Sequence, residues 1–232
     1  MSWKPVPKPA EIAESRLLEA ILDGTFAINS SLPGERDLAA QIGVTRPTLR
    51  EAMQRLARDG WLDIQHGKAT RVRDYWHEGS LAVLNVLAEA PQGHRPDFVA
   101  YLMEIRLLLA PAYTHQTLET AANDVLELLK RADQLDPEPI CYAQFDWELH
   151  SLLTQRAENP VFRLLLNSFE NLYQGMAARY FSFDECRQHS QNFYAALRDC
   201  IQSGQLCDAE KLTRQTMAES LDLWKRLHGG GA

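Results

Sequence analysis

Apolar residues recur at helical spacing from the beginning of the chain. The first run places its apolar residues on one side of a predicted helix that ends at Gly24: Ile12, Leu17, Leu18, Ile21 and Leu22. Residues 1–10 contain three prolines and predict an extended arm before that helix. The Ser-Ser-Leu-Pro-Gly stretch at 30–34 predicts a turn after it.

Two more helices follow, and their ends are marked by glycine and threonine. Residues 35–42 predict a short helix that ends at Gly43. Thr45 is a good N-cap for the next helix, and Pro47 lies in its first turn, where a missing N–H costs little. This third helix ends at Gly60, and its apolar residues have the spacing of a core-facing stripe: Leu49, Ala52, Met53, Leu56 and Ala57.

Strand-forming residues come next. Residues 61–65 and 68–73 predict two strands, and His66-Gly67 predicts the tight hairpin that joins them. Only Gly43-Val44 separates the second helix from the third, as a helix-turn-helix requires. Three helices followed by a two-stranded ribbon therefore predict a winged helix-turn-helix domain over residues 1–73.

After residue 73 the pattern becomes helical throughout. Residues 74–96 predict a linker that contains a helix, and the prolines at 91 and 96 mark a break. Six helical stretches then predict an antiparallel bundle over residues 97–228: 97–118, 121–134, 138–156, 160–180, 186–203 and 205–227. The predicted fold class is mainly α, with an N-terminal winged helix-turn-helix, a small β-hairpin wing and a C-terminal antiparallel α-helical bundle.

Charge is distributed unevenly along this acidic chain. The net charge is −7, but residues 36–73 hold eight Lys and Arg against four Asp and Glu. A local basic patch can bind nucleic acid on an acidic protein, because salt screens charges beyond about 10 Å. The four cysteines lack metal-binding spacing and predict free thiols in a reducing compartment. With no apolar leader and no membrane-spanning stretch, the sequence predicts a cytoplasmic protein without a membrane partner.

The third helix has side chains suited to reading DNA. Arg46 and Arg50 are four residues apart, so they are neighbours on the face opposite the apolar stripe. Arginine suits bidentate contacts with guanine in the major groove. The hydroxyls of Thr45 and Thr48 can donate to phosphates at the helix start, and Arg36 in the preceding helix can reach the flanking backbone.

The ribbon has the features of a DNA-binding wing. Gly67 permits a sharp turn from which the His66 ring can project into a minor groove. Lys68, with Arg71 and Arg73, is expected at the phosphates beside it. The alternative is a solvated charged helix and an ordinary hairpin, and any single arginine fits it. The helix order, short turn, capped arginine face and basic wing together favour DNA binding.

These residues resemble a known family. The segment LPGERDLAAQIGVTRPTLREAMQRLARDGWLDIQHGKATRV (32–72) resembles the DNA-binding domain of GntR-family transcription regulators, and within it RLARDGWLDIQHGK is typical of the fatty-acid-responsive FadR group. A weaker resemblance continues through NPVFRLLLNSFENLYQGMAARYF (159–181). It implies a homodimer on a palindromic double-stranded operator, with a helical domain whose long-chain acyl-CoA ligand weakens DNA binding. It also implies repression of fatty acid degradation and activation of unsaturated fatty acid synthesis.

The resemblance also implies which residues contact each partner. The DNA-contacting positions are Arg36, Thr45, Arg46, Thr48, Arg50 and His66, while Pro47 replaces a threonine and removes one expected phosphate contact. The effector-contacting positions are Arg106, Tyr173, Tyr180, Tyr194, Ser220 and Trp224, and Met217 replaces a glycine beside the ligand. A buried tyrosine supplies an apolar body and one hydroxyl. Core packing remains the alternative for each tyrosine.

The sequence gives little support for a metal site or for an enzymatic activity. Asp146 and His150 are one helical turn apart, and related GntR regulators of the FCD type hold a metal with an aspartate and three histidines to bind small carboxylates. That regulator type is the alternative function. Ala195 and Ala218 stand where two further ligands would fall, so we expect no metal, and instead a hydrogen-bonded pair or a histidine near the ligand cavity. No hydrolase, metalloprotease or phosphate-loop motif occurs, so the sequence predicts no enzyme and no cofactor.

Overall fold

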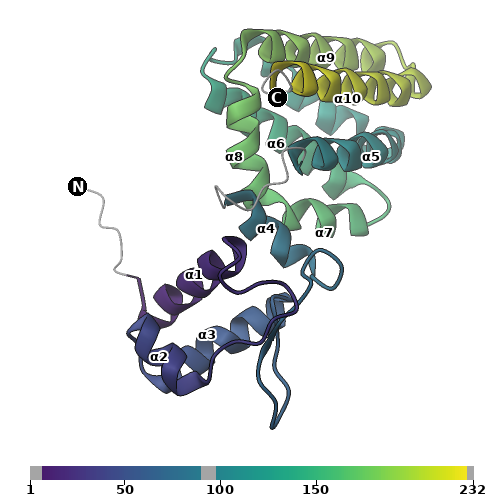
Figure 1. Cartoon of the computed structure of the whole chain (residues 1–232). Helices are drawn as coiled ribbons and strands as arrows, with labels where there is room; N and C mark the ends of the chain where they lie inside the picture. Colours follow the sequence, from purple (N-terminus) through teal and green to yellow (C-terminus); the bar gives the residue numbers. More distant parts are fainter. Residues whose placement is uncertain (1–6, 90–97, 229–232) are drawn as a thin grey trace. The chain divides into compact units, whose positions relative to one another are not determined.

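The computed structural model describes residues 7–89 and 98–228 of the chain (Figure 1). They form two compact units, one within residues 1–94 and the other within 95–232. Helices dominate both units. Among the helices of these described ranges, none combines the length and the hydropathy that crossing a membrane requires.

The first unit contains three helices and a two-stranded ribbon, followed by a fourth helix. Both α1 and α2 pack against α3 (Figure 1). The bounds of the elements are α1 Pro9–Leu22, α2 Glu35–Ile42, α3 Arg46–Asp59, β1 Leu62–Asp63, β2 Arg71–Val72 and α4 Leu81–Glu89.

The predicted signals at the ends of α3 are confirmed. Thr45 is its N-cap, and its side-chain oxygen accepts a hydrogen bond from the backbone N–H of Thr48. Gly60 ends the helix with a φ of 100°, a left-handed conformation that favours glycine. The predicted stripe of α3 is buried, except for Ala57, which is only half-buried.

The prediction for α1 was wrong in two places. The helix begins at Pro9 rather than after residue 10, because proline at the first helical position loses no hydrogen bond. Residues 1–6 of the predicted arm lie outside the described residues. Ile12 is 37% exposed, and Ala13 takes its place on the buried face with Leu17 and Ile21.

The ribbon is shorter than predicted and is joined by a third segment. β1 and β2 have two residues each and pair antiparallel, with Leu62 opposite Val72. The stretch at 30–34 is not a turn, because Ser31 forms a bridge with Arg71 and the Leu32 N–H donates to the Thr70 carbonyl. The first loop therefore supports the base of the ribbon, which the sequence pattern did not indicate.

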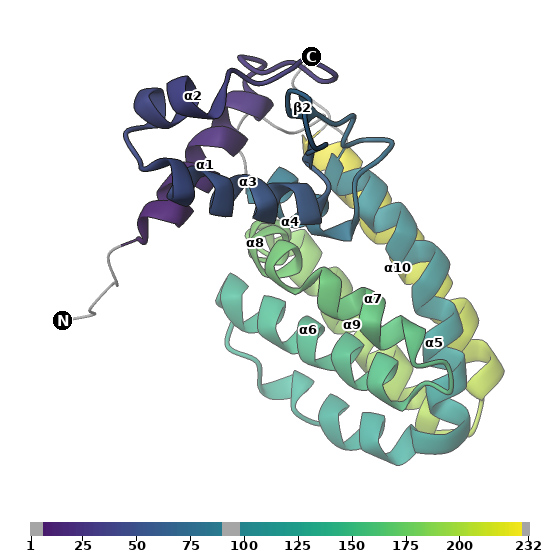
Figure 2. The same ribbon diagram turned by 90° about the horizontal axis from the view of Figure 1, so that it is seen from below.

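The second unit is a bundle of helices. α10 runs beside α5 and α9, and α6 packs against α5 and α8 (Figures 1 and 2). The interior contains large apolar side chains from these helices, including Leu129, Leu149 and Leu197. The bounds are α5 Phe98–Leu129, the 3-10 turn η1 Ala132–Gln134, α6 Pro139–Arg156, α7 Val161–Ser168, α8 Glu170–Tyr180, α9 Asp184–Gln202 and α10 Leu206–His228.

One of two predicted helix boundaries in this unit is confirmed, and one predicted helix was wrong. The break predicted between 97–118 and 121–134 is confirmed as a kink within α5 at Ala121, where φ is −134° and ψ is 30°. The stretch predicted at 160–180 is two helices, α7 and α8, because Phe169 departs from helical geometry with φ −104° and ψ 2°. No glycine or proline lies at Phe169, so local composition did not indicate this second break.

Candidate functional site

The exposed face of α2 and α3 holds the side chains predicted to read DNA. Arg46 and Arg50 are both exposed, one turn apart on α3. The Thr45 and Thr48 hydroxyl oxygens are 2.8 Å apart at the start of the helix. Since these groups point to solvent in the first turns of α3, they are available to a double helix that approaches this face.

Two carboxylates at the start of α2 accompany the arginines. Arg50 Nε donates to Glu35 Oε2 at 2.7 Å, and Arg36 Nε donates to Asp37 at 3.1 Å. Arg50 uses only Nε, so its two Nη groups have no partner within the described part of the chain. Glu35 therefore restrains the Arg50 side chain and leaves the planar edge of its guanidinium for a base or a phosphate.

The wing presents His66 at a turn. The backbone carbonyl of Gln65 accepts from the Lys68 N–H at 3.2 Å, so His66 and Gly67 are the two central residues of this turn. Gly67 has a φ of 73°, which a residue with a side chain adopts only with strain. His66 and Lys68 are both exposed, and the Lys68 amine donates to the Gln65 side chain at 2.8 Å.

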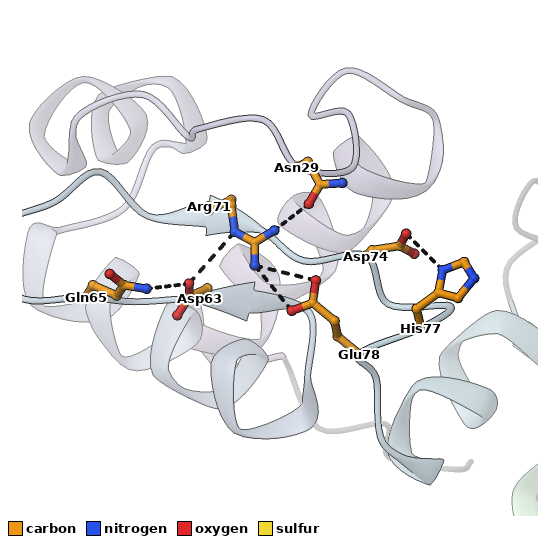
Figure 3. A network of polar contacts seen from close by, with 7 residues as sticks. All are labelled: Asn29, Asp63, Gln65, Arg71, Asp74, His77 and Glu78. Carbon is orange, nitrogen blue, oxygen red and sulfur yellow. Dashed lines mark hydrogen bonds and ion pairs between the residues drawn. The ribbon is translucent and has the colours of Figure 1, made fainter.

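Arg71 has a different environment from the one expected of a phosphate ligand. Its guanidinium donates to Asn29 and, at 3.2 Å, to Glu78 Oε2, and it lies 3.8 Å from Asp63 (Figure 3). These partners come from the loop before α2, from β1 and from the segment after β2. Arg71 therefore ties the ribbon to its surroundings, a role that the sequence pattern did not reveal.

The segment after the ribbon is joined closely to the end of α3. Ser80 Oγ donates to the Asp59 carbonyl at 3.0 Å and accepts from the Ala82 N–H at 3.3 Å, so it connects α3 to the first turn of α4. A Cβ on Gly60 would lie 3.1 Å from Gly79 Cα. Within this unit, the two residues before α4 are thus in direct contact with the end of the helix that carries Arg46 and Arg50.

The second unit contains a cavity lined mainly by apolar side chains, with residues from α5, α6, α7, α8 and α10 in its wall. The atom-free space is about 960 Å³, counting the space at its opening. A few polar side chains also line it: Arg106, Tyr113, His150, Thr154, Tyr173 and Tyr180. A mainly apolar cavity with a few polar groups is the usual form of a small-molecule site.

A buried ion pair lies at the cavity wall. Arg106 Nη2 donates to Asp146 Oδ2 at 2.7 Å, and the Tyr194 hydroxyl donates to Asp146 Oδ1 at 2.9 Å. The Tyr173 hydroxyl also donates to Oδ2. Burial alone would raise the pKa of Asp146, but Arg106 and the hydrogen bonds lower it, so the carboxylate stays charged.

His150 completes this polar group. Its Nε2 is in hydrogen-bond contact with Arg106 Nη2, and its Nδ1 lies 2.7 Å from the Tyr113 hydroxyl oxygen. The side chain is 1% exposed, and burial together with the Arg106 charge lowers its pKa to about 3, so the imidazole is neutral at physiological pH.

The comparisons with known proteins agree with this architecture. Residues 9–72 match the family model for bacterial regulatory proteins of the gntR family, and residues 73–230 match that for the FadR C-terminal domain. The chain belongs to the GntR family, with a FadR-type C-terminal domain. It is therefore a DNA-binding transcription regulator and not an enzyme.

Relatives of the same kind cover nearly the whole chain. A fatty acid metabolism regulator protein of Pasteurella multocida is 36% identical over 219 residues, which are 94% of this chain and 91% of that protein. The protein of the same name from Shewanella frigidimarina is 37% identical over 94% of this chain and 92% of its own length. A Listeria monocytogenes structure described as Lar, which controls expression of the agr system, has the same fold, with a TM-score of 0.61 at 18% identity over 97% of this chain and 100% of that one.

The structure brings together four of the seven residues expected at the effector site of this GntR-family chain. Arg106, Tyr173, Tyr180 and Trp224 line the cavity. Tyr194 is buried and contacts Asp146, one layer behind the lining. Two residues of α10 were expected at the ligand and are buried without lining the cavity: Met217 and Ser220.

Two cavity residues were missed or left open by the sequence. Tyr113 carried no sequence signal. His150 was expected either to form a hydrogen-bonded pair with Asp146 or to lie near the ligand cavity; it lines the cavity, and the hydrogen-bond partners of its side chain are Arg106 and Tyr113 rather than Asp146. Asp146 and His150 each contact Arg106, and their side chains are 3.7 Å apart. Across the ranges that the structure describes, no cluster of three or more His, Cys, Asp or Glu residues could hold a metal ion.

Proposed function

We propose that this regulator controls genes of fatty acid metabolism and that long-chain acyl-CoA releases it from DNA. In this proposal the chain acts as a homodimer on a palindromic operator, represses fatty acid degradation and activates unsaturated fatty acid synthesis. The relatives that match 94% of this chain are named fatty acid metabolism regulator proteins, which supports fatty acid metabolism as the regulated process. The apolar cavity in the FadR-type domain supports the effector.

The cavity is the observation on which the effector depends. Phe162, Phe169 and Met176 are among the apolar side chains that form its wall. An acyl chain bound there would leave water and gain about 25 cal/mol for each Å² of apolar surface buried. A small, highly charged carboxylate would gain little from such a wall, so an acyl chain suits the cavity better than the ligands of metal-dependent relatives do.

DNA binding is assigned to the exposed face of α2 and α3 and to the ribbon. Arg46 and Arg50 would read base edges, and Thr45 and Thr48 would bind phosphates at the start of α3. His66 would enter the minor groove from its turn. The binding of two half-sites requires a fixed spacing of two recognition helices, which makes operator affinity sensitive to the arrangement of the dimer.

Release from DNA requires that the ligand prefer one arrangement of the protein. An effector shifts an equilibrium only by the difference between its affinities for the two states. We infer that α4 conveys the shift, because Ser80 connects the start of α4 to the end of α3. Equal acyl-CoA affinities for the free and the DNA-bound protein would contradict this route.

The decisive experiment measures operator binding while acyl-CoA is added. Fluorescence anisotropy with a labelled operator duplex should show weaker DNA binding as palmitoyl-CoA is added, and native mass spectrometry should show which acyl-CoA the purified protein retains. Leu166→Trp, which fills the cavity from α7, should make DNA binding insensitive to palmitoyl-CoA. Leu164→Trp is the matched control, because Leu164 is 64% exposed on the same helix.

The same measurements can reject the proposal. Operator affinity that no acyl-CoA changes, whatever its chain length, would remove the effector from the proposal. Identical responses of the Leu166 and Leu164 variants would mean that the ligand acts from outside this cavity.

A further inference from the structure

The hydrogen-bond directions around His150 follow from the chemistry of Arg106. Arg106 Nη2 is in hydrogen-bond contact with both Asp146 Oδ2 and His150 Nε2. A guanidinium has only donors, so each of its two hydrogens on Nη2 must meet an acceptor. His150 Nε2 is therefore unprotonated and accepts the hydrogen bond.

The tautomer of His150 then determines whether the Tyr113 hydroxyl accepts or donates in the hydrogen bond between them. A neutral imidazole with an unprotonated Nε2 carries its hydrogen on Nδ1. Since Nδ1 lies 2.7 Å from the Tyr113 hydroxyl, Nδ1–H donates and the tyrosine oxygen accepts. The hydroxyl hydrogen of Tyr113 is thereby left for another acceptor.

No acceptor for that hydrogen comes from the described parts of the protein, and the cavity lies beside it. Tyr113 lines the cavity and is only 5% exposed, so its hydrogen is shielded from bulk solvent. Edge contacts with Phe162 and His150 hold the ring, with centroids 5.7 and 5.8 Å away. A buried hydroxyl donor without an acceptor costs free energy that a ligand can recover.

The balance of charge indicates what kind of acceptor fits. Arg106 is paired with Asp146, and His150 and the surrounding tyrosines are neutral, so the buried group has no net charge. A carboxylate placed there would be a buried charge without a counter-ion, which is strongly unfavourable. A carbonyl oxygen accepts a hydrogen bond and carries no charge.

We propose that Tyr113, oriented by His150, donates a hydrogen bond to the thioester carbonyl of the bound acyl-CoA and makes the site selective for the ester over the free acid. This inference rests on the proposed function, because it assumes that the cavity holds an acyl-CoA. Tyr113 is then a specificity-determining residue, and His150 is a positioning residue that acts through it. The selectivity comes from the direction of one hydrogen bond and not from charge.

The test compares two ligands that differ only at the carbonyl. Palmitoyl-CoA has the thioester, and S-hexadecyl-CoA is the thioether that lacks the carbonyl oxygen. Isothermal titration calorimetry on the full chain should show that the native protein prefers the thioester by about 3- to 10-fold, as expected for one neutral hydrogen bond. Palmitate should bind more weakly than either CoA compound.

Tyr113→Phe should abolish this preference. Its affinity for palmitoyl-CoA should fall by about 3- to 10-fold, while its affinity for S-hexadecyl-CoA stays the same and shows that the cavity is intact. His150→Phe should also reduce the preference, because the Tyr113 hydroxyl then loses its orientation. Tyr142→Phe is the matched control: Tyr142 donates to Gln191 and does not line the cavity, so the preference should persist.

The outcomes separate this inference from the proposed function. If the native protein binds neither CoA compound, the proposed effector is wrong, and this inference is wrong with it. If both compounds bind and Tyr113→Phe keeps the native preference for the thioester, only the role of Tyr113 is wrong. Tight binding of palmitate with an affinity equal to that of palmitoyl-CoA would overturn the selectivity argument.

Discussion

Acid should destabilise the folded protein, because folding keeps the His150 imidazole neutral. The folded protein holds this imidazole neutral, because burial and Arg106 lower its pKa to about 3. In the unfolded chain a histidine has a pKa of about 6.5 and binds a proton below that pH. The stabilisation is therefore complete above about pH 6.5 and is lost as the pH falls toward the folded pKa.

The magnitude follows from the distance between the pH and the unfolded pKa. At about pH 5 the unfolded histidine lies about 1.5 pH units below its pKa, and each unit is worth about 1.4 kcal/mol. His150 should thus reduce the free energy of unfolding by about 2 kcal/mol between about pH 8 and pH 5. The groups around it should not titrate in this range, because the pKa of Asp146 is lowered and those of Tyr113, Tyr173 and Tyr194 are raised by burial.

The assay is urea unfolding of the full chain at both pH values, followed by circular dichroism. His150→Gln should unfold more readily at high pH, because buried hydrogen bonds are lost, but it should lose about 2 kcal/mol less than the native protein on acidification. His66→Gln removes an exposed histidine from the wing and is the matched control, which should keep the native pH dependence. Equal pH dependence of the native and His150→Gln proteins would refute the buried neutral histidine.

Three further perturbations test the DNA-binding unit. Arg46→Ala should cost about 1–3 kcal/mol of operator affinity and relax base preference, measured by anisotropy with mutated operators, whereas Arg58→Ala at the far end of α3 should leave the preference intact. Lys68→Ala should weaken binding to all sequences alike and reduce the slope of log affinity against log salt by about one, and a sequence-dependent loss would contradict a phosphate contact. Gly79→Ala would place a Cβ 2.3 Å from the Tyr75 carbonyl oxygen. The variant should therefore lose about 1–3 kcal/mol of the free energy of unfolding, measured as a lower midpoint of thermal unfolding. Gly34→Ala meets nothing within 4 Å, and a fall of the same size in that variant would show that the crowding at Gly79 is not the cause.

The elements of the DNA-binding unit were predictable where neighbouring residues decide them. α2 has the predicted bounds, and α3 begins directly after Thr45, because caps and glycines act within one turn of the chain. The support of β2 by Ser31 was not predictable in this way. It depends on the path of the loop before α2, which is set by packing and not by spacing.

In the helical unit, too, the local sequence predicted some features and missed others. Periodicity indicated helices in the right regions and a break beside the kink at Ala121, but it missed the break at Phe169, which no glycine or proline marks. Resemblance placed Arg106 and Trp224 at the cavity but also Met217, which is buried elsewhere in α10. The Tyr113–His150 contact joins residues that are 37 positions apart, so no local sequence pattern predicts it.

Arginine has opposite environments in the two units, and this would allow an acidic chain to bind both DNA and the proposed effector. Arg46 is exposed and has no counter-ion among the described residues, so it can release condensed cations from DNA, a gain that salt removes. Arg106 is buried and paired with Asp146, so it contributes no net charge to the cavity. Its effect on the proposed ligand would be indirect, because Arg106 accounts for the tautomer of His150 and, through it, the free hydrogen of Tyr113. The net charge of −7 therefore opposes neither proposed function, because DNA would be recognised by a local basic face and the proposed effector by the direction of hydrogen bonds.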